Sequence, residues 1–315
     1  DKVEDDTKEA MSTIGATHVT IKAGTFNSAI VGGSAAIVYY GYANKGVTTS
    51  VGTTNVKIEG GTFNHAIVAG GLASGHRTHS FVTEANLSVI AKDELAVNDS
   101  IFAGGVRRMD SLGGSGGSVK VEHATVRVEG VKVQGGIYGT HAALTGTVSP
   151  SDSNNISEWH YKPLKNNGDF ATVLTDMTLV NVTAKESILG EKSTLNVHGK
   201  VKLNELKATD VKISLFDAPA NTPKVQTFAD DAPQTGTQLN LDKLTGTGNS
   251  FYFATSDASV NIKEKGNAGS ETEPLIDSIT GSGSVNDDVA GDLNELASMV
   301  TVGGTSGAEV LKNTD

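Results

Sequence analysis

Two segments of this chain repeat each other, and this repeat constrains the fold more than any other feature. Residues 18–33 read HVTIKAGTFNSAIVGG, and residues 55–70, which lie 37 positions later, read NVKIEGGTFNHAIVAG. Self-similarity at such a period is typical of stacked-repeat architectures. One short unit cannot bury its apolar face alone, whereas stacked units bury a continuous core. The repeat therefore predicts a stack of similar units.

Weaker copies follow the same template. Two apolar residues are separated by one residue of any type, and isoleucine or leucine stands nine positions after the second apolar residue. The alternation at the start predicts a half-buried strand. The spacing of 18 residues between the last two copies indicates a minimal unit, so longer spacings imply loops. The copies are Val19/Ile21/Ile30, Val56/Ile58/Ile67, Leu87/Val89/Ile101 with three inserted residues, Val126/Val128/Ile137, Met177/Leu179/Ile188 and Leu195/Val197/Leu206.

Equivalent residues of stacked units should lie about 4.8 Å apart, one above the other. We therefore expect columns of like side chains. An isoleucine column is expected at positions 30, 67, 101, 137 and 188, and an aromatic one at Phe26 and Phe63 that narrows to Val97 and Val133. A third column reads Asn27, Asn64, Asn98 and Gln134 and should end at Lys185.

The asparagine column has two interpretations. Amide side chains in register can hydrogen-bond along a stack, and asparagine also simply tolerates the left-handed backbone of a turn. Glycine pairs recur nearby, and we expect them to form sharp corners at positive φ. These pairs are Gly60–Gly61, Gly70–Gly71, Gly104–Gly105 and Gly135–Gly136.

The expected fold class is all-β: a right-handed parallel β-helix, or solenoid, with long loops on one face and a short C-terminal helix. Val289, Leu293, Leu296 and Val300 form the helical stripe, with Asn286 or Asp287 as the cap. The expected boundaries are an N-terminal extension at 1–16, a β-helix at 17–285, a helix at 286–300 and a tail at 301–315. The loops are expected near 34–53, 72–84, 107–123, 141–174 and 218–237.

Composition narrows the class of function. The formal net charge is −11, from 25 Lys and Arg against 36 Asp and Glu, which argues against nucleic-acid partners. Cysteine is absent, so disulfides and thiolate metal sites are excluded. No apolar run is long enough for a membrane-spanning helix. The chain opens at Asp1 without a start methionine, and we expect it to be an excised or processed fragment.

The strands near the end of the chain carry a family resemblance. Residues 239–248 read LNLDKLTGTG and are followed by Phe251-Tyr-Phe and Val260-Asn-Ile262, which resembles the last turns of type V autotransporter passengers. The Gly-Gly-Thr-Phe-Asn segments resemble adhesin-type passengers. This resemblance implies a Gram-negative bacterium and display on the extracellular side of its outer membrane, or secretion. It further implies that the β-barrel translocator lies outside this chain and that this part inserts into no membrane.

The residues give little support for a catalytic function. The serine-rich segments 113–118 and 281–284 lack the acidic neighbour of a protease nucleophile motif. His76 and His79 lack an adjacent third ligand for zinc, so we expect no metal and no cofactor. Glu59 and Glu129 are the main strand carboxylates and should lie two units apart, about 10 Å. A β-helical polysaccharide lyase or glycoside hydrolase is the alternative, and a trimeric phage tailspike is a third reading.

The leading expectation is a non-catalytic adhesin or structural stalk whose loops contact host glycans, host proteins or neighbouring bacterial cells. Exposed aromatic and basic side chains in the loops are the candidates for this contact. The same aromatic rings could instead fold the loops back onto the strands. The candidate binding residues are Tyr39, Tyr40, Tyr42, His76, Arg77, His79, Arg107, Arg108, Trp159, His160 and Tyr161.

Overall fold

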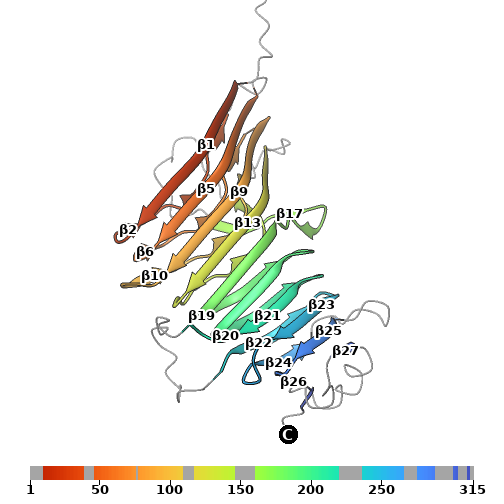
Figure 1. Cartoon of the computed structure of the whole chain (residues 1–315). Coiled ribbons are helices and arrows are strands. Elements are labelled where there is room, and N and C mark those ends of the chain that lie inside the picture. The colour runs from red at the N-terminus through yellow and green to blue at the C-terminus, as the bar shows by residue number, and fades with distance from the viewer. Residues whose placement is uncertain are drawn as a thin grey trace, which may run out of the picture.

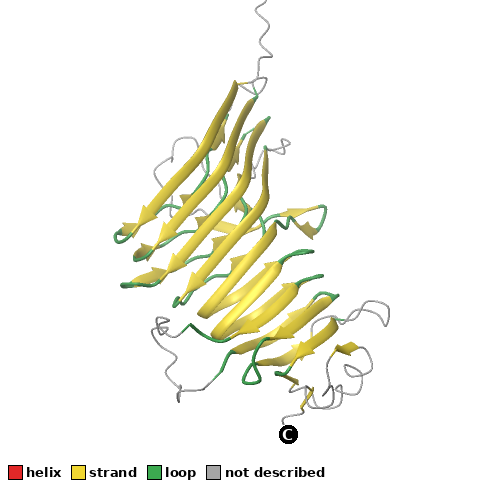
Figure 2. Cartoon of the chain, in the orientation of Figure 1, coloured by secondary structure: helices red, strands yellow, loops and turns green. Residues whose placement is uncertain are grey.

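The fold is all-β, and the described residues contain no helix (Figure 2). The computed structural model describes residues 10–38, 46–75, 77–108, 117–145, 160–219, 236–265, 275–287, 301–303 and 311–312. Within these ranges no helix could therefore cross a membrane.

Four successive units repeat the same order of strands, a long strand followed by short ones. Unit one consists of β1 (Ala10–Ile21), β2 (Thr25–Phe26), β3 (Ile30–Val31) and β4 (Ala35–Ile37). Unit two consists of β5 (Val47–Ile58), β6 (Gly61–Phe63), β7 (Ile67–Val68) and β8 (Leu72–Ser74). Unit three consists of β9 (Thr78–Ile90), β10 (Leu95–Val97), β11 (Ile101–Phe102) and β12 (Val106–Arg108). Unit four consists of β13 (Ser118–Glu129), β14 (Ile137–Tyr138) and β15 (Ala142–Thr145).

The later strands stack on the same pile with fewer residues between them. They are β16 (His160–Pro163), β17 (Lys165–Asn166), β18 (Asp169–Phe170), β19 (Leu174–Leu189), β20 (Thr194–Ala208), β21 (Lys212–Phe216), β22 (Gln238–Thr245), β23 (Asn249–Phe253), β24 (Ser259–Lys265), β25 (Ile276–Gly281), β26 (Ser284–Asp287), β27 (Thr301–Gly303) and β28 (Leu311–Lys312). The pairs β15–β16 and β17–β18 are antiparallel, and the other strand pairs of the described residues are parallel. Figure 1 shows the long strands lying side by side from β1 to β26.

The stack is held in the register that the repeat predicts. Strand β1 pairs with β5 so that Val19 lies beside Val56 and Ile21 beside Ile58. The short strands β3, β7, β11 and β14 also pair in the predicted register, which places Ile30 beside Ile67, Ile67 beside Ile101 and Ile101 beside Ile137. Ile67, Ile101 and Ile137 are fully buried, and Ile30, in the first unit, is half-buried and packs against the same core. The expected isoleucine column is confirmed over these four positions.

The column does not continue to Ile188, and this part of the prediction is wrong. Ile137 pairs with Ser187, and Ile188 pairs with Tyr138 one position later. Leu206 likewise pairs with Ser187 and not with Ile188. Relative to unit four, β19 is one residue shorter in this region: Lys132 pairs with Thr183, an offset of 183 − 132 = 51, whereas Ile137 pairs with Ser187, an offset of 187 − 137 = 50. This slip of one residue places Ser187 in the isoleucine column and turns Ile188 to the opposite face. Strand β20 has one more residue than β19 at the register irregularity between Val180 and Val182, so Leu206 again reaches Ser187.

The aromatic and amide columns are also present. The rings of Phe26 and Phe63 stack with centroids 4.9 Å apart and planes 6° apart. Val97 follows Phe63 in register and Val133 follows Val97.

The amide column is a hydrogen-bonded ladder across the first three units. Asn64 donates from Nδ2 to Asn27 Oδ1 at 2.7 Å, and Asn98 donates to Asn64 Oδ1 at 2.8 Å. The hydrogen-bonded interpretation of the asparagines is therefore confirmed for these two steps.

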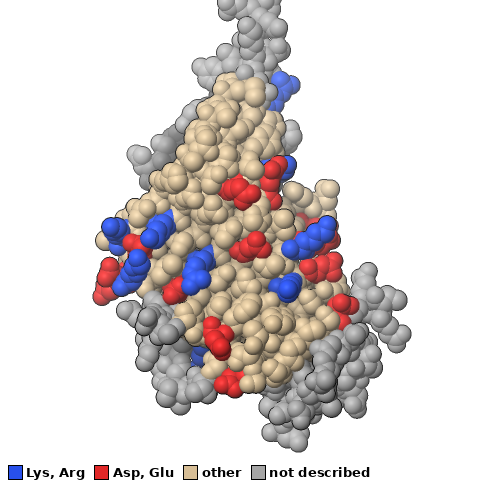
Figure 3. All heavy atoms as spheres, in the orientation of Figure 1, with Lys and Arg blue, Asp and Glu red and all other residues tan. Residues whose placement is uncertain are grey.

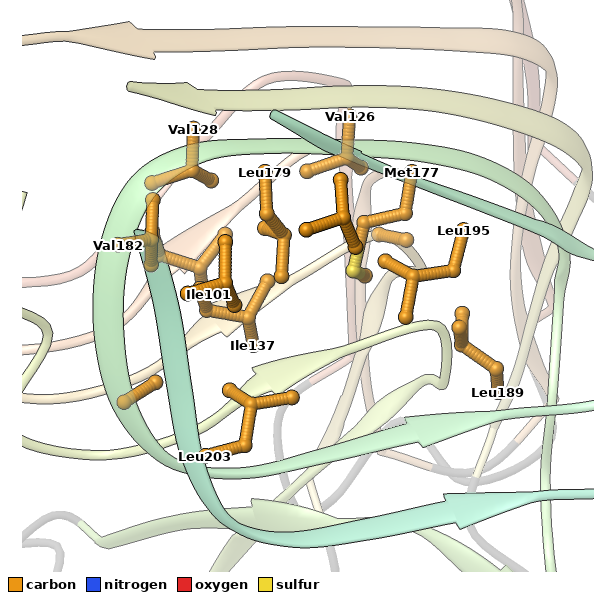
Figure 4. Packing of buried hydrophobic residues seen from close by; sticks show 14 of the residues in the cluster. Ile101, Val126, Val128, Ile137, Met177, Leu179, Val182, Leu189, Leu195 and Leu203 are labelled. Atoms are coloured by element: carbon orange, nitrogen blue, oxygen red, sulfur yellow. The ribbon is translucent and has the colours of Figure 1, made fainter. Parts of the chain in front are cut away.

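The interior residues of the long strands meet those of the short strands in one continuous core. Figure 4 shows side chains from β11, β13, β14, β19 and β20 converging on the same space, with Ile101 and Ile137 facing Leu179 and Val126. Burial of aliphatic side chains of this size contributes about 1.5–3 kcal/mol each.

A second, smaller core lies on the other side of the short strands. Val68, Phe102, Tyr138 and Ile188 point away from the main core and pack against residues of β12 and β15. The strands β4, β8, β12, β15 and β16 form a separate five-stranded sheet that covers this side. Segments expected as loops at 34–53, 72–84, 107–123 and 141–174 thus supply strands, because their Thr-, Val- and Ala-rich ends alternate like the repeat itself.

The expected boundaries change at both ends. Strand β1 begins at Ala10, inside the expected extension at 1–16, and pairs with β5 from Val47 onward. Asn286 and Asp287, expected to cap a helix, belong to strand β26. The rest of the expected helix, 288–300, and residues 220–235 of the loop expected at 218–237 lie outside the described residues. In the tail expected at 301–315, the described residues form β27 and β28.

The glycine pairs act through close packing more than through backbone angle. Of the eight paired glycines only Gly61 has a positive φ, 114°. A Cβ at Gly71 would overlap the hydroxyl of Ser80, and one at Gly136 would overlap the ring of Tyr138. The expected positive φ is therefore wrong for the other pairs, which use glycine to let neighbouring side chains approach the backbone.

Ile67 and Ile30 offer a matched test of the stack. Ile67→Ala should destabilise the protein by about 2–5 kcal/mol because its fully buried side chain leaves a cavity. Ile30→Ala, at the half-buried end of the same column, should cost roughly half as much, and Ile67→Asp should prevent folding. Urea unfolding followed by circular dichroism measures both costs; equal losses at the two positions would contradict the column.

Candidate functional site: the loop edge of the stack

The stretches that lie outside the described residues in units one to four begin and end along one line, which we call the loop edge. Three of them are segments, 39–45, 109–116 and 146–159, and in unit two the single residue His76 joins Gly75 to Arg77. Backbone hydrogen bonds join these points from unit to unit: Val38 N to Ser74 O at 2.9 Å, Val47 N to Arg77 O at 3.0 Å and Gly117 N to Gly75 O at 2.8 Å. The described ends of these stretches therefore share one edge, between the five-stranded sheet and the long strands.

Five of the candidate binding residues, Tyr39, Tyr40, Tyr42, His76 and Trp159, lie outside the described residues. Their neighbours in the chain are at the loop edge.

Arg77 and His79 sit where unit three begins. Arg77 is exposed and has a φ of 51°, a left-handed backbone conformation that is uncommon for a residue with a side chain. His79 lies in β9, shares a 2.7 Å hydrogen bond between its Nδ1 and Ser118 Oγ, and stacks on Phe81 with ring centroids 6.1 Å apart. His79 therefore belongs to the strand surface next to the loop edge.

Arg107 and Arg108 lie in β12 and are half-buried. In register, Arg107 lies between Ala73 and Ala143, and Arg108 lies beside Leu144 of the second core. The Nε of Arg107 is buried without a hydrogen-bond partner, although the residue makes other interactions. Both arginines are thus part of the sheet, and their side chains are only partly available to a ligand.

His160 and Tyr161 lead the longest segment back onto the stack. Strand β16 pairs antiparallel with β15, with His160 opposite Thr145 and Tyr161 opposite Leu144. Tyr161 packs on the second core and meets His65 edge-on at 6.4 Å, and burial raises its pKa to about 12. For Tyr161 the structure supports folding back onto the strands, whereas His160 is exposed.

Beneath Tyr161 lies a polar cluster that the sequence did not reveal. The buried Tyr138 donates its hydroxyl to Glu186 Oε1 at 2.7 Å, and Lys207 donates to Glu186 Oε2 at 3.0 Å. Burial raises the pKa of Tyr138 well above its usual range, with Glu186 adding to the effect. Burial also raises the pKa of the nearby Asp99, against the opposing influence of hydrogen bonds from Ser100.

This cluster depends on the second column of the repeat. Tyr138 occupies the position of Val31, Val68 and Phe102, and its ring lies over Gly136, which has no side chain to obstruct it. The signal in the sequence was the change from valine to phenylalanine and then tyrosine in this column, one position after each column isoleucine.

A second cluster, also missed, lies on the outer face of the long strands. His123 of β13 bonds through Nδ1 to Glu84 Oε2 of β9 and through Nε2 to Asp176 Oδ2 of β19, both at 2.9 Å. A neutral imidazole has one N–H, so both bonds are donated only by the charged form. The hydrogen bond to Glu84 is the main cause that raises the pKa of His123, with partial burial opposing it. Figure 3 shows charged side chains gathered across the middle of this face.

Glu59 and Glu129, the two glutamates considered as a catalytic pair, each form ion pairs with basic residues of their own. Glu59 pairs with Lys57 at 2.8 Å and Lys92 at 2.6 Å, which lowers its pKa to about 2. Glu129 pairs with Arg127 at 2.6 Å, and Ile90 lies beside it in register on the side toward Glu59. The described residues hold no group of three or more His, Asp or Glu placed to bind a metal ion.

Comparison of the chain with protein-family models, with curated proteins and with solved structures gives no match.

Tyr138→Phe tests the buried cluster. It removes a hydrogen bond to a carboxylate and should destabilise the protein by about 1.5–3 kcal/mol. Tyr252→Phe, which removes the hydroxyl of a tyrosine that is 40% exposed, is the matched control and should change stability by less than about 0.5 kcal/mol. Equal effects in chemical unfolding would contradict the buried role of the Tyr138 hydroxyl.

His123 makes stability depend on pH. The pKa of His123 is raised in the folded state. Its contribution to the free energy of unfolding is therefore fully present below the pKa of the unfolded chain, about 6.5, and is lost as pH rises through the pKa of the folded protein. Because the side chains of His123 and its partners are 30% and 47% exposed, each pair contributes at most about 1 kcal/mol. Wild type should exceed His123→Gln in Tm at about pH 5.5 and lose this advantage by about pH 8.5.

The charged groups around His123 are Glu84 and Asp176 on the adjacent strands and the Lys120–Glu122 pair on its own strand. Lys120→Gln, which alters only the exposed pair, is the control. A difference in Tm between wild type and His123→Gln that stays constant with pH would exclude the charged bridge.

Proposed function

We propose that this chain is a right-handed parallel β-helix of the autotransporter-passenger type. It acts at the surface of a Gram-negative bacterium, or after secretion, as a non-catalytic adhesin or structural stalk. The observation that carries the proposal is the shared edge: the described ends of three segments, 39–45, 109–116 and 146–159, lie at neighbouring positions of the stacked units. In stacked-repeat proteins the insertions collect on one face, which is often the binding face.

Two features of the stack suit a stalk. Each unit contacts mainly the units beside it, as the paired registers show, so length can be built without a globular centre. The hydrogen-bonded edges of the long strands are covered by neighbours from β5 to β24. A rigid support of this kind holds loops at fixed distances from one another, which favours contact with extended partners such as glycans, proteins or neighbouring cells.

The alternative is a β-helical polysaccharide lyase or glycoside hydrolase, and Asp99 is the residue that favours it. Its raised pKa is a property of catalytic acids. A carboxylate that could pair with it, Glu186, lies two strand spacings along the stack, about 10 Å away. The hydroxyl of the buried Tyr138 donates to Glu186 and interacts electrostatically with Asp99, so protein groups already engage both carboxylates. This arrangement supports a structural role for both carboxylates.

The longest segment at the loop edge provides the test. Thr145 and His160 are opposite each other in an antiparallel pair, so residues 146–159 can be replaced by a short glycine-containing turn without separating β15 from β16. The variant should keep the thermal stability of the wild type. It should lose most of the adhesion or cell aggregation that the intact protein confers when displayed on bacteria.

The matched control replaces 109–116, the shorter segment of unit three, in the same way. A 146–159 variant that folds normally and retains full adhesion would argue against this segment. Retention of adhesion by a variant lacking both segments would overturn the loop edge as the working surface. Cleavage of a polysaccharide by the wild type, lost in Asp99→Asn, would favour the enzyme.

A further inference from the structure

A group of aromatic side chains lies on the outer face of the later strands, away from the loop edge of units one to four. His198 of β20 is in register with Phe216 of β21, and Tyr252 of β23 is in register with Ser214. The residues that alternate with them, Val197, Leu215, Phe251 and Phe253, are buried in the main core. Because side chains alternate along a strand, His198, Phe216 and Tyr252 point outward.

These three rings are in contact. His198 and Phe216 stack with centroids 5.3 Å apart and planes 21° apart. Phe216 meets Tyr252 edge-on at 6.3 Å. His198 Nδ1 donates to the carbonyl oxygen of Asp217 at 2.8 Å, which fixes the orientation of the imidazole. The rings therefore form one connected surface, which we call the aromatic platform.

The Tyr252 side chain is exposed next to a buried serine. Ser214 points outward between Ile213 and Leu215, yet it is only 3% exposed. A serine side chain is too small to bury itself, so larger neighbours cover it, and Tyr252 and Asn196 are its neighbours in register. Tyr252 itself remains 40% exposed. Ser214 is thus covered by its neighbours, whereas Tyr252 keeps a large exposed surface.

Polar groups surround the platform. The Lys212 amine lies over the Tyr252 ring, 5.9 Å from its centre, and leaves the rest of this exposed side chain open to a ligand. Asn196, Ser250 and Thr280 occupy neighbouring outward positions on β20, β23 and β25. An exposed ring bordered by amides, hydroxyls and a cation matches the chemistry of a sugar. The C–H groups on one side of a pyranose carry partial positive charge and stack on the negative face of an aromatic ring, while its hydroxyls bond to the border.

We propose that the aromatic platform of His198, Phe216 and Tyr252 is a binding site for a pyranose unit of a glycan, with Lys212 favouring sugars that carry a carboxylate. This site goes beyond the proposed function, because it lies on the strand surface and needs none of the segments at the loop edge. A chain with both surfaces holds a glycan along its side while its loops contact a partner.

Saturation-transfer NMR with the full chain tests the site directly. The probes are an oligogalacturonate and a malto-oligosaccharide of equal length, one acidic and one neutral. Saturation of the aromatic protons should reach the sugar C–H protons of both, more strongly for the acidic probe. Tyr252→Ala should weaken binding at least about tenfold, as expected for an anchoring aromatic ring. Tyr252→Phe keeps the ring and should retain binding.

Leu174→Ala is the matched control, because Leu174 is 44% exposed on the same sheet but has no ring. It should bind like the wild type, and Lys212→Gln should remove the preference for the acidic probe. No saturation of either probe, or full binding by a folded Tyr252→Ala variant, would overturn the proposal. Replacing segments 109–116 and 146–159 should leave saccharide binding intact, so the platform and the loop edge succeed or fail independently.

Discussion

Parallel pairing in register is the constraint on which the rest of this structure depends. Because each strand lies beside its equivalent in the next unit, a residue type that suits one position suits the same position above and below. Isoleucine then packs on isoleucine, phenylalanine on phenylalanine and asparagine on asparagine. Each contact is modest, but all of them depend on the same register, and a slip of one residue would exchange the buried and exposed faces of a whole strand.

The repeat was sufficient to predict the inner columns, since it records the register directly. Ile30 and Ile67 are identical residues at the repeat spacing, and so are Phe26 and Phe63. Each pair is therefore expected at equivalent positions of neighbouring units. The outer column was missed because only Val31 and Val68 are identical, and Phe102, Tyr138 and Ile188 share no more than apolarity with them. The phase change in β19 was equally hidden, since the loss of one residue between Thr183 and Ser187 leaves no signal in the composition.

The polar and aromatic clusters on the strand surface were harder to predict from the sequence for a related reason. His123, Glu84 and Asp176 are 39 and 53 residues apart in the chain and meet only because three strands lie side by side. Tyr252 and Phe216 come together in the same way. Sequence reasoning placed function in loops because loops carry the tyrosines and the tryptophan, and it treated the strand surface as inert. Yet Arg107, Arg108 and Tyr161, expected in loops, lie within or against sheets.

The asparagine ladder has a direction, and this direction makes its members unequal toward chemical ageing. Asn98 donates to Asn64, and Asn64 donates to Asn27. Deamidation converts the amide to a carboxylate, which accepts hydrogen bonds and cannot donate them. At Asn27, the receiving end, the bond from Asn64 survives and gains a charged acceptor. At Asn64 the donor is lost and a carboxylate faces the Asn27 oxygen. One spontaneous reaction is thus tolerated at the end of the ladder and disruptive one unit further in.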